Sequence, residues 1–596
     1  MRTDERPEGG AGKSLKAWVR ALEATAAIER GQAPILPLLF TELAARFGTA
    51  PALITKNETL TFTELNATVT RYARWGLAQG WRAGDVVCLL MPNCLHYMPI
   101  WLGLTRIGVV VSLLNSNLTD APLAHAVRVI TPRALIVSPE LCATVRSISA
   151  HLPHSLSLWA DGANDSAVPR LDLAMAEMAA EPLTDTECPP PGLNDRALYI
   201  YTSGTTGLPK AANVSHRRLM QWSHWFAGLM DTGPTDRMYN CLPLYHSIGG
   251  VVATGATLVR GGAVVLRERF SARDFWQDVV QQRCTLFQYI GELCRYLLAT
   301  APQPEETAHQ LRLCCGNGLR ADVWQQFQQR FRIPQILEYY AATEGSFSLY
   351  NCEGRIGAIG RIPPFLSHRM RVELIRHDME RALPARDDQG RCIKCAPAEI
   401  GEAIGPLVAD GSGRFEGYAD AAASHSKILR DVFVAGDSWY RTGDLLRQDE
   451  QGFFYFVDRI GDTFRWKGEN VSTTEVAAII AGCAGVTDVA VYGVAVPNAD
   501  GRAGMAALVV DEKFDLGTLQ QHLLTLPPYA RPLFLRIVAE IERTGTFRLK
   551  KAELASQGYD PSRIADELYL ADGEQGRYVL FDTRLHDLIL AGQVRL

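Results

Sequence analysis

A stretch rich in glycine and hydroxyl side chains is the strongest candidate for chemistry in this sequence. Residues 199–210 read YIYTSGTTGLPK, an apolar, β-prone start that changes abruptly to Thr, Ser and Gly. That change is typical of a strand that leads into a loop around an anion. Glycines let backbone N–H groups approach a phosphate, hydroxyl groups add donors, and a lysine adds positive charge. We therefore predict that nucleotide phosphates are bound by Thr202, Ser203, Gly204, Thr205, Thr206, Gly207 and Lys210.

The chain lacks several common sequence motifs of nucleotide-binding proteins and hydrolases. It lacks the GxxxxGK followed by Ser or Thr of a Walker A sequence, so a P-loop NTPase is disfavoured. The chain also contains no GxSxG and no HExxH, and we identify no protein nucleophile.

A second segment adds side chains suited to the rest of a nucleotide. Residues 336–345 read ILEYYAATEG, a strand that ends in a Gly-terminated loop. The aromatic face of Tyr340 suits adenine, Thr343 suits a phosphate oxygen, and the Glu344 carboxylate suits Mg²⁺. Standing alone, the segment would be a buried strand end with a capping threonine. Beside the phosphate loop we favour the nucleotide interpretation, with Ala341 in the site as well.

Two weaker signals point in the same direction. Residues 440–444, YRTGD, place Asp444 after a glycine turn, where a carboxylate could accept both ribose hydroxyls. Residues 311–320, LRLCCGNGLR, join a short strand to a turn that by itself is only a tight turn, made of Gly316, Asn317 and Gly318.

A histidine in a glycine-flanked bend is a further candidate. Residues 240–250 read NCLPLYHSIGG and contain His246. A lone histidine is more often structural than functional, so the residue pattern alone does not decide its role.

Taken together, these strings resemble a known family. YTSGTTGLPK resembles the signature of the adenylate-forming superfamily, which contains acyl-CoA synthetases, luciferases and the adenylation domains of peptide synthetases. Four further strings, GNGLR, YNCEGRIGAIGR, DRIGDTFRWKGENVSTTEV and TGTFRLKKAEL, are similar to the very-long-chain acyl-CoA synthetases, or fatty acid transport proteins. DTFRWKGEN is the most selective of them. The resemblance covers residues 35–596.

The resemblance implies an ATP-dependent fatty acid–CoA ligase that forms an acyl-adenylate and releases AMP and pyrophosphate. Its partners would be a fatty acid, ATP and CoA, with Mg²⁺ at Glu344 and at Thr205 of the phosphate loop. The other implied contacts are the 316–318 turn on adenine and ribose, Asp444 on the ribose, Arg459 on ribose or phosphate, His246 beside the acyl pocket, and Gly468 near the pantetheine path of CoA.

The sequence departs from the family at one important position. Members usually have Lys directly after TGTF, whereas this chain has Arg548, followed by Lys550 and Lys551. The family lysine is implied to bridge the substrate carboxylate and the α-phosphate. Arginine is a planar fork and lysine a compact charge, so the exchange is not conservative. The sequence leaves open whether Arg548, Lys550 or Lys551 supplies the cation, or whether adenylation is slow.

Two rival functions therefore stay open. The first is a related ligase with another acid, or with a carrier protein as acceptor. The second, from a different class, is a weakly catalytic fatty acid binding or uptake protein that has lost its lysine.

Composition excludes several broad classes. The chain has 596 residues, 21% of them charged, and a net charge of −5, so nothing suggests a nucleic-acid partner. Its 13 cysteines are scattered and odd in number, which favours a reducing compartment, and we expect a cytoplasmic protein. No stretch reaches the ~20 uninterrupted apolar residues of a membrane-spanning helix. Peripheral membrane contact and a homodimer stay open.

Strand-like and helix-like segments alternate through the first part of the chain, for example at 86–91, 99–107 and 109–114. Such alternation is typical of α/β layers with a mostly parallel sheet. Local patterns also suggest helix starts, with Thr63 as one N-cap and Thr473 or Thr474 as another.

The predicted fold class is α/β, with a large N-terminal domain of layered α/β subdomains and a smaller, mobile C-terminal α+β lid. Residues 361–415 are rich in strand signals, and we expect them to form a small β-barrel-like subdomain. The predicted parts are a leader at 1–34, the large domain at 35–460 and the lid at 461–596. The resemblance implies that Gly461 and Asp462 form the hinge and that the lid rotates about Gly461 between the two half-reactions, which suits a glycine.

Overall fold

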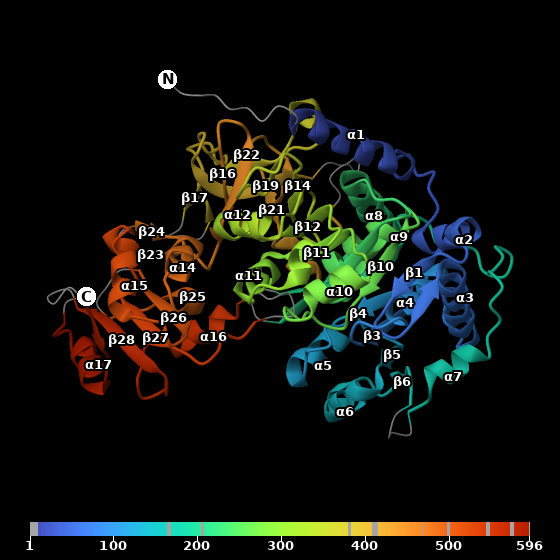
Figure 1. Ribbon diagram of the computed structural model, residues 1–596, viewed down its shortest axis with the longest axis horizontal. Coiled ribbons are helices and arrows are strands. Elements are labelled where there is room, and N and C mark those ends of the chain that lie inside the picture. Colours follow the sequence, from blue (N-terminus) through green and yellow to red (C-terminus); the bar gives the residue numbers. More distant parts are fainter. Residues whose placement is uncertain are drawn as a thin grey trace. The chain divides into compact units, whose positions relative to one another are not determined.

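The computed structural model describes residues 10–163, 168–203, 208–378, 383–407, 415–467, 469–497, 501–543, 549–572 and 577–594 (Figure 1). The chain divides into two compact units. The first unit consists of residues 1–363 and 409–428, and the second of residues 364–408 and 429–596.

The first unit contains a sheet that ends in the strands flanking the predicted phosphate loop. Its neighbouring strands are parallel except for the last pair, which forms an antiparallel hairpin. The strand order is β6 (Ser157–Ala160), β5 (Ala134–Val137), β3 (Val86–Leu90), β4 (Val110–Leu113), β7 (Arg196–Ser203) and β8 (Pro209–Ser215). β4 and β5 are buried along their whole length, as expected for a parallel sheet covered on both faces. α3 (Phe62–Ala78) precedes β3, and the helices between the strands are α4 (Tyr97–Arg106), α5 (Asp120–Arg128), α6 (Cys142–Ser147) and α7 (Leu171–Ala176).

A second run of strands in the first unit carries the other predicted motifs. Its order is β15 (Gly360–Arg361), β14 (Ser348–Asn351), β13 (Ile336–Ala341), β12 (Leu313–Asn317), β11 (Leu286–Ile290), β9 (Arg237–Asn240), β10 (Ala263–Leu266), β1 (Pro51–Ile54) and β2 (Thr59–Thr61). The strands from β13 to β1 in this order are parallel. The carboxyl ends of parallel strands meet at one edge, where ligands of open α/β sheets bind. The segments after β9, β12 and β13 therefore belong to the same edge.

Helices accompany this second run. They are α1 (Gly10–Glu29), α2 (Leu36–Phe47), α8 (His216–Met230), α9 (Thr254–Leu258), α10 (Phe275–Gln281), α11 (Gly291–Ala299), α12 (Ala321–Arg330) and α13 (Ala421–His425). α1 packs closely on α8, because Gly228 has no side chain and an added Cβ would lie 2.5 Å from the Ala21 Cα. The Trp18 and Trp225 rings meet edge to face at this contact, 5.9 Å between centroids.

The second unit begins with an antiparallel sheet in the order β16 (Glu373–Ile375), β19 (Ile400–Pro406), β21 (Ser438–Gln448) and β22 (Phe453–Arg459). Shorter strands nearby are β17 (His377–Asp378), β18 (Leu383–Pro384) and β20 (Ile428–Arg430). The expectation of a β-barrel-like subdomain is wrong for the described residues. β16 ends the strand order and does not pair with β22, and a barrel requires that closure.

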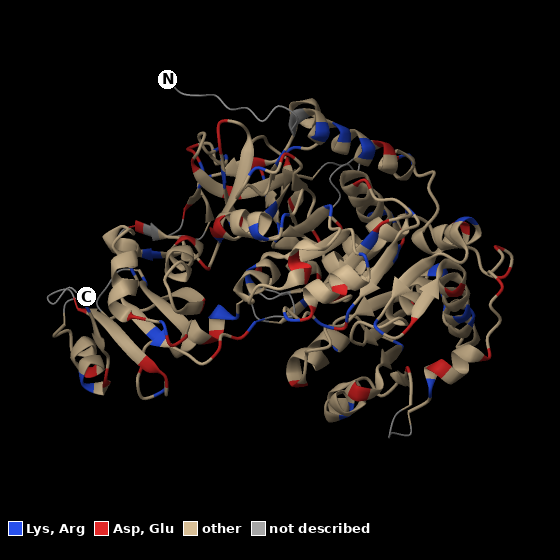
Figure 2. Cartoon of the chain, viewed as in Figure 1, with Lys and Arg blue, Asp and Glu red and all other residues tan. Residues whose placement is uncertain are grey.

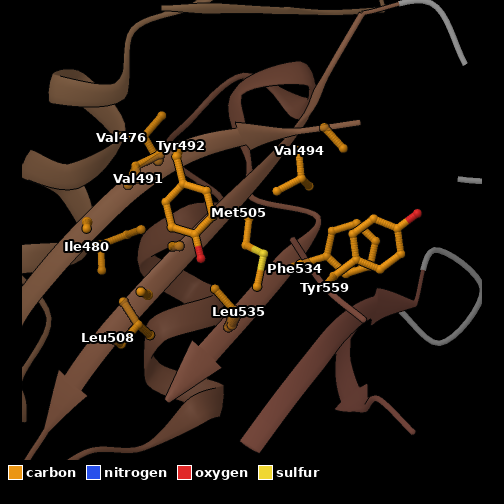
Figure 3. Close-up of a cluster of buried hydrophobic side chains, with 14 of the residues drawn as sticks. Val476, Ile480, Val491, Tyr492, Val494, Met505, Leu508, Phe534, Leu535 and Tyr559 are labelled. Carbon is orange, nitrogen blue, oxygen red and sulfur yellow. The ribbon is translucent and has the colours of Figure 1, made fainter. Parts of the chain in front are cut away.

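The C-terminal part of the second unit is an α+β structure. Its sheet has the order β25 (Val486–Val494), β26 (Ala503–Val510), β27 (Phe534–Ile537), β28 (Glu567–Asp572) and β29 (Arg577–Leu580). The hairpin β23 (Phe464–Trp466) and β24 (Glu469–Val471) precedes it, and the helices are α14 (Thr473–Ala481), α15 (Leu516–Leu523), α16 (Lys551–Gln557) and α17 (Thr583–Leu590). Val491, Met505 and Leu535 lie in the core of this sheet (Figure 3). The Phe534 and Tyr559 rings stack there at 4.2 Å.

Two predicted helix caps are wrong by one or two residues. α3 is capped by Thr61, not Thr63, because the Thr61 hydroxyl accepts from the Glu64 N–H while the Glu64 carboxylate accepts from the Thr61 N–H. α14 is capped by Ser472, which accepts from the Glu475 N–H at 3.3 Å.

Charged residues of both signs are interspersed over most elements, with several basic positions along α1 (Figure 2). Among the described helices, none combines the length and apolar character needed to cross a membrane.

Candidate active site

The predicted phosphate loop joins β7 to β8 in the first unit. The hairpin register places Lys210 opposite Thr202, and both side chains are half-buried. The strand pair therefore fixes the two ends of the loop relative to each other. The loop tip lies outside the described residues, as do Gly204, Thr205, Thr206, Gly207 and the Ser203 side chain.

The predicted phosphate cation and the predicted metal carboxylate contact the same tyrosine. The Lys210 Nζ lies 6.0 Å from the centre of the Tyr418 ring. The Tyr418 hydroxyl donates a hydrogen bond of 2.6 Å to Glu344 Oε1. Glu344 itself is 6% exposed. The structure thus brings Lys210 and Glu344, which are 134 positions apart, to one side chain that sequence reasoning did not identify.

Thr343 is held in place by contacts to its backbone and its side chain. Its carbonyl oxygen accepts from Arg218 Nη1 of α8 at 2.7 Å. Its Oγ1 lies 3.2 Å from Ser247 Oγ, which follows β9. The loop after β13 is therefore fixed to α8 and to the bend that contains His246.

His246 is an uncharged ring at neutral pH. Burial lowers the pKa of its imidazole to about 4. Its ring lies 4.5 Å from that of Tyr245, and within the described part of the chain its Nε2 has no hydrogen-bond partner. A neutral aromatic ring of this kind suits the wall of an apolar pocket, and the pocket role of His246 stays a prediction.

The glycine turn after β12 is shaped by a buried carboxyl group. An added Cβ on Gly316 would lie 2.3 Å from the Tyr289 carbonyl oxygen, and Gly318 has φ +76°, so the turn needs both glycines. Glu338 is 1% exposed. The oxygens of its carboxyl group accept from the Leu319 N–H at 3.1 Å and from the Tyr289 hydroxyl at 2.5 Å. Burial raises the pKa of Glu338 to about 8.

The aromatic candidate for adenine lies next to this turn in the sheet. β12 and β13 are paired so that Gly316 lies opposite Glu338. Tyr340, two residues further along β13, is half-buried, and its ring lies 6.2 Å from that of Phe347. Asn317 is half-buried, and Ala341 is exposed.

The ribose candidate lies in the second unit. Asp444 of β21 is paired in register with Arg459 of β22, and Arg459 Nε lies 3.2 Å from Asp444 Oδ1. The preceding turn is supported by Glu402, which is fully buried and forms a bidentate ion pair with Arg441 at 2.9 and 2.7 Å. Glu402 also accepts from the Gly443 N–H at 3.1 Å.

Two of the three candidate C-terminal cations have partners in their own unit. The Lys550 Nζ donates to Glu542 Oε2 at 2.8 Å on an exposed surface. The Lys551 Nζ donates to Thr473 Oγ1 at 2.7 Å. Arg548 and Gly468 lie outside the described residues.

Sequence reasoning missed four residues that support the predicted site, namely Arg218, Glu338, Glu402 and Tyr418. An acidic residue inside an apolar strand, as in ILEYY, was a usable signal for Glu338. The other three act through contacts between segments that are far apart in the sequence, for which the local pattern holds no signal.

Comparison with known proteins identifies the class. Residues 40–418 match the model of the AMP-binding enzyme family, and residues 475–548 match the AMP-binding enzyme C-terminal domain. The chain therefore belongs to the AMP-binding enzyme family.

Similar proteins identify a smaller group within this family. The chain is 42% identical over 571 residues to long-chain fatty acid transport protein 1 of Mus musculus, covering 94% of this chain and 88% of the relative. It is 39% identical to long-chain fatty acid transport protein 6 of Homo sapiens, covering 95% and 92%. The relationship to the fatty acid transport proteins expected from the sequence motifs is confirmed.

Solved structures agree with the fold. ATP-bound MatB from Rhodopseudomonas palustris has a TM-score of 0.73 at 23% identity, with 87% of this chain and 98% of that chain covered. The anthranilate CoA ligase AuaEII with anthranoyl-AMP has a TM-score of 0.74 at 19% identity, with 88% and 97% covered. The predicted α/β class with a smaller C-terminal domain is confirmed by these likenesses.

Proposed function

We propose that this protein is an ATP-dependent long-chain fatty acid–CoA ligase. In the first step, a carboxylate oxygen of the fatty acid attacks the α-phosphorus of ATP and pyrophosphate leaves. In the second step, the CoA thiol attacks the carbonyl carbon of the acyl-adenylate. The bond from that carbon to the AMP oxygen breaks, the thiol proton is released, and the products are acyl-CoA and AMP.

The proposed roles follow the chemistry of each group. Lys210 and the hydroxyls of its loop bind the β- and γ-phosphates, Tyr340 lies against adenine, and Asp444 accepts the ribose hydroxyls. No residue acts as a nucleophile, so the residues orient the reactants and stabilise developing charge.

The divalent cation has a suitable place. Mg²⁺ prefers oxygen ligands, and the Glu344 carboxylate is buried and oriented by a neutral hydroxyl donor, with the half-buried Thr343 next to it. We infer that Glu344, together with oxygens of Thr343 or Thr205, would hold Mg²⁺. Bound there, the ion would offset the negative charge of the phosphates.

One observation in the structure gives the proposal its strongest support. The Lys210 ammonium and the Glu344 carboxylate both contact Tyr418, at the end of a hairpin whose loop has the glycines and hydroxyls of a phosphate site. Similarity to relatives that are named long-chain fatty acid transport proteins supports the choice of a long-chain acid.

The replacement of the family lysine by Arg548 favours a function without efficient catalysis. Lys550 donates to Glu542 and Lys551 donates to Thr473. If neither of them takes the place of the family lysine, the chain is a weakly catalytic fatty acid binding protein. A ligase for another acid, or one with a carrier-protein acceptor, is the remaining alternative.

An ATP–pyrophosphate exchange assay with acids of increasing chain length separates these functions. We expect exchange that depends on the acid and is greatest with long chains. No exchange with any acid, together with measurable fatty acid binding, would support the weakly catalytic alternative. Exchange confined to short or aromatic acids would support the other ligase.

A further inference from the structure

A short segment far along the chain runs antiparallel to β8, the second strand of the phosphate hairpin. Residues 415–419 run next to β8, where the Asn213 N–H donates to the Gly417 carbonyl at 2.9 Å and the Ala419 N–H donates to the Ala211 carbonyl at 2.8 Å. An isolated β-bridge pairs Ala212 with Tyr418. This pairing fixes Tyr418 opposite a residue only two positions from Lys210.

The glutamate two positions before Tyr418 anchors the segment. Glu416 Oε2 accepts from the Ser215 N–H at 2.7 Å, and Glu416 Oε1 accepts from the Ser215 hydroxyl at 2.6 Å. Arg218 Nε lies 3.4 Å from the same Oε1, and Arg218 also donates to the Thr343 carbonyl. The segment is thus tied to the start of α8 and, through Arg218, to the loop before Glu344.

The Tyr418 side chain contacts two groups of opposite charge. It is 6% exposed, and its hydroxyl donates to the Glu344 carboxylate at 2.6 Å. A hydrogen bond to an ionised acceptor is stronger than a neutral one. The Lys210 ammonium lies 6.0 Å from the ring centre, at the limit of a cation–π contact. A neutral hydroxyl orients the carboxylate without adding a positive charge that would compete with a cation.

We propose that Tyr418 is a positioning residue that orients Glu344 for a divalent cation and Lys210 for the nucleotide phosphates, and so sets how strongly ATP binding depends on the cation. The proposal rests on the proposed function. It assigns separate tasks to the two parts of the side chain, because the hydroxyl acts on the carboxylate and the ring acts on the ammonium.

The two tasks are tested by calorimetry, which measures the affinity for ATP once in the presence of Mg²⁺ and once in EDTA, without a divalent cation. Tyr418→Phe removes the hydroxyl and keeps the ring. We expect MgATP to bind about tenfold more weakly, the loss of one hydrogen bond to a charged group, while metal-free ATP binds within about twofold of wild type. Tyr418→Leu removes the ring too, and we expect it to weaken metal-free ATP binding as well.

Tyr455→Phe is the matched control. The Tyr455 hydroxyl also donates to a carboxylate, Asp449 Oδ2 at 2.9 Å, but outside the candidate site. We expect its two ATP affinities to equal those of wild type. Wild-type MgATP affinity in Tyr418→Phe, or an equal loss of both affinities, would overturn the proposal.

A second set of variants keeps the proposal testable if Tyr418→Phe folds poorly. In a Glu344→Gln background the carboxylate is gone, so adding Tyr418→Phe should not change the cation dependence further. Additive effects of the two substitutions would contradict a shared role. If wild type itself binds no ATP, the proposed function fails. If wild type binds MgATP and the variants do not differ from it, only the role of Tyr418 fails.

Discussion

At the scale of single residues, the cation for adenylation is the sharpest question. Three candidates follow the TGTF sequence; the structure gives partners to two of them, and the third, Arg548, lies outside the described residues. Lys550 pairs with Glu542 on the surface, and Lys551 is bound to Thr473. Arg548 is therefore the candidate that we propose for the adenylation step, and its fixed charge suits stabilisation of a phosphate-centred transition state.

Substitution separates the candidates. We expect Arg548→Ala to slow pyrophosphate exchange by about 100-fold or more, the usual effect of removing one preorganised donor. The matched control, Lys550→Ala, removes only an exposed ion pair and should change the rate by less than about threefold. A larger loss in the lysine variant than in the arginine variant would assign the role to Lys550.

Glu338 gives a prediction about pH at the same scale. Burial raises the pKa of its carboxyl group to about 8, so the folded protein retains a proton that the unfolded chain releases from about pH 4.5 upward. Its contribution to stability is fully present below about pH 4.5 and is lost as the pH rises through 8.

Glu338→Gln has no proton to lose at this position. Between pH 6 and pH 9, we expect the free energy of unfolding of wild type to fall by about 3 kcal/mol more than that of the variant. Urea unfolding at a series of pH values measures this difference. Parallel stability curves for the two proteins would show that Glu338 is ionised when folded.

At the scale of elements, two hydrogen bonds in the second unit join the segments on either side of the predicted hinge. Asp458, at the end of β22, accepts from the Thr473 N–H at 2.7 Å and from its hydroxyl at 3.0 Å. These bonds connect β22 to the start of α14, on the other side of Gly461. Gly461 has φ +98°, and an added Cβ would meet no atom within 4 Å. A side chain there would strain the backbone without any clash.

Gly461→Ala therefore tests the hinge. We expect thioester formation to slow by about fivefold relative to adenylation, because a strain of roughly 1 kcal/mol at residue 461 would act on the lid rotation that we propose between the two steps. Gly436→Ala is the control, since Gly436 has φ +83° and equally open surroundings. Rapid-quench measurement of each half-reaction gives the ratio, and an unchanged ratio in Gly461→Ala would remove the hinge assignment.

The helix caps show how well local sequence patterns predict where a helix begins. The spacing Thr-x-x-Glu holds the correct answer for α3, since Thr61 and Glu64 satisfy each other's N–H groups, but the nearby Thr63 offered a competing start. For α14, three hydroxyl residues in a row made the local choice ambiguous, and Ser472 provides the cap.

At the scale of the whole molecule, the sequence predicts the parallel strands well because they are short, apolar and separated by helices. The short strand expected within LRLCCGNGLR is β12, in which Cys314 and Cys315 are fully buried. The predicted barrel is wrong because strand signals reveal neither partner nor closure. Tyr418 was missed for a related reason: its pairing partner is about 200 residues earlier, and only tertiary structure brings them together.

The central claim is that the fatty acid is activated as an acyl-adenylate, and oxygen transfer tests it most directly. A long-chain fatty acid with ¹⁸O in both carboxylate positions would be converted in the presence of ATP and CoA, and the products analysed by mass spectrometry. We predict that AMP gains one ¹⁸O atom, because the attacking oxygen stays on phosphorus when the thiol attacks the carbonyl carbon. Unlabelled AMP, or label in pyrophosphate or inorganic phosphate, would contradict the proposed mechanism.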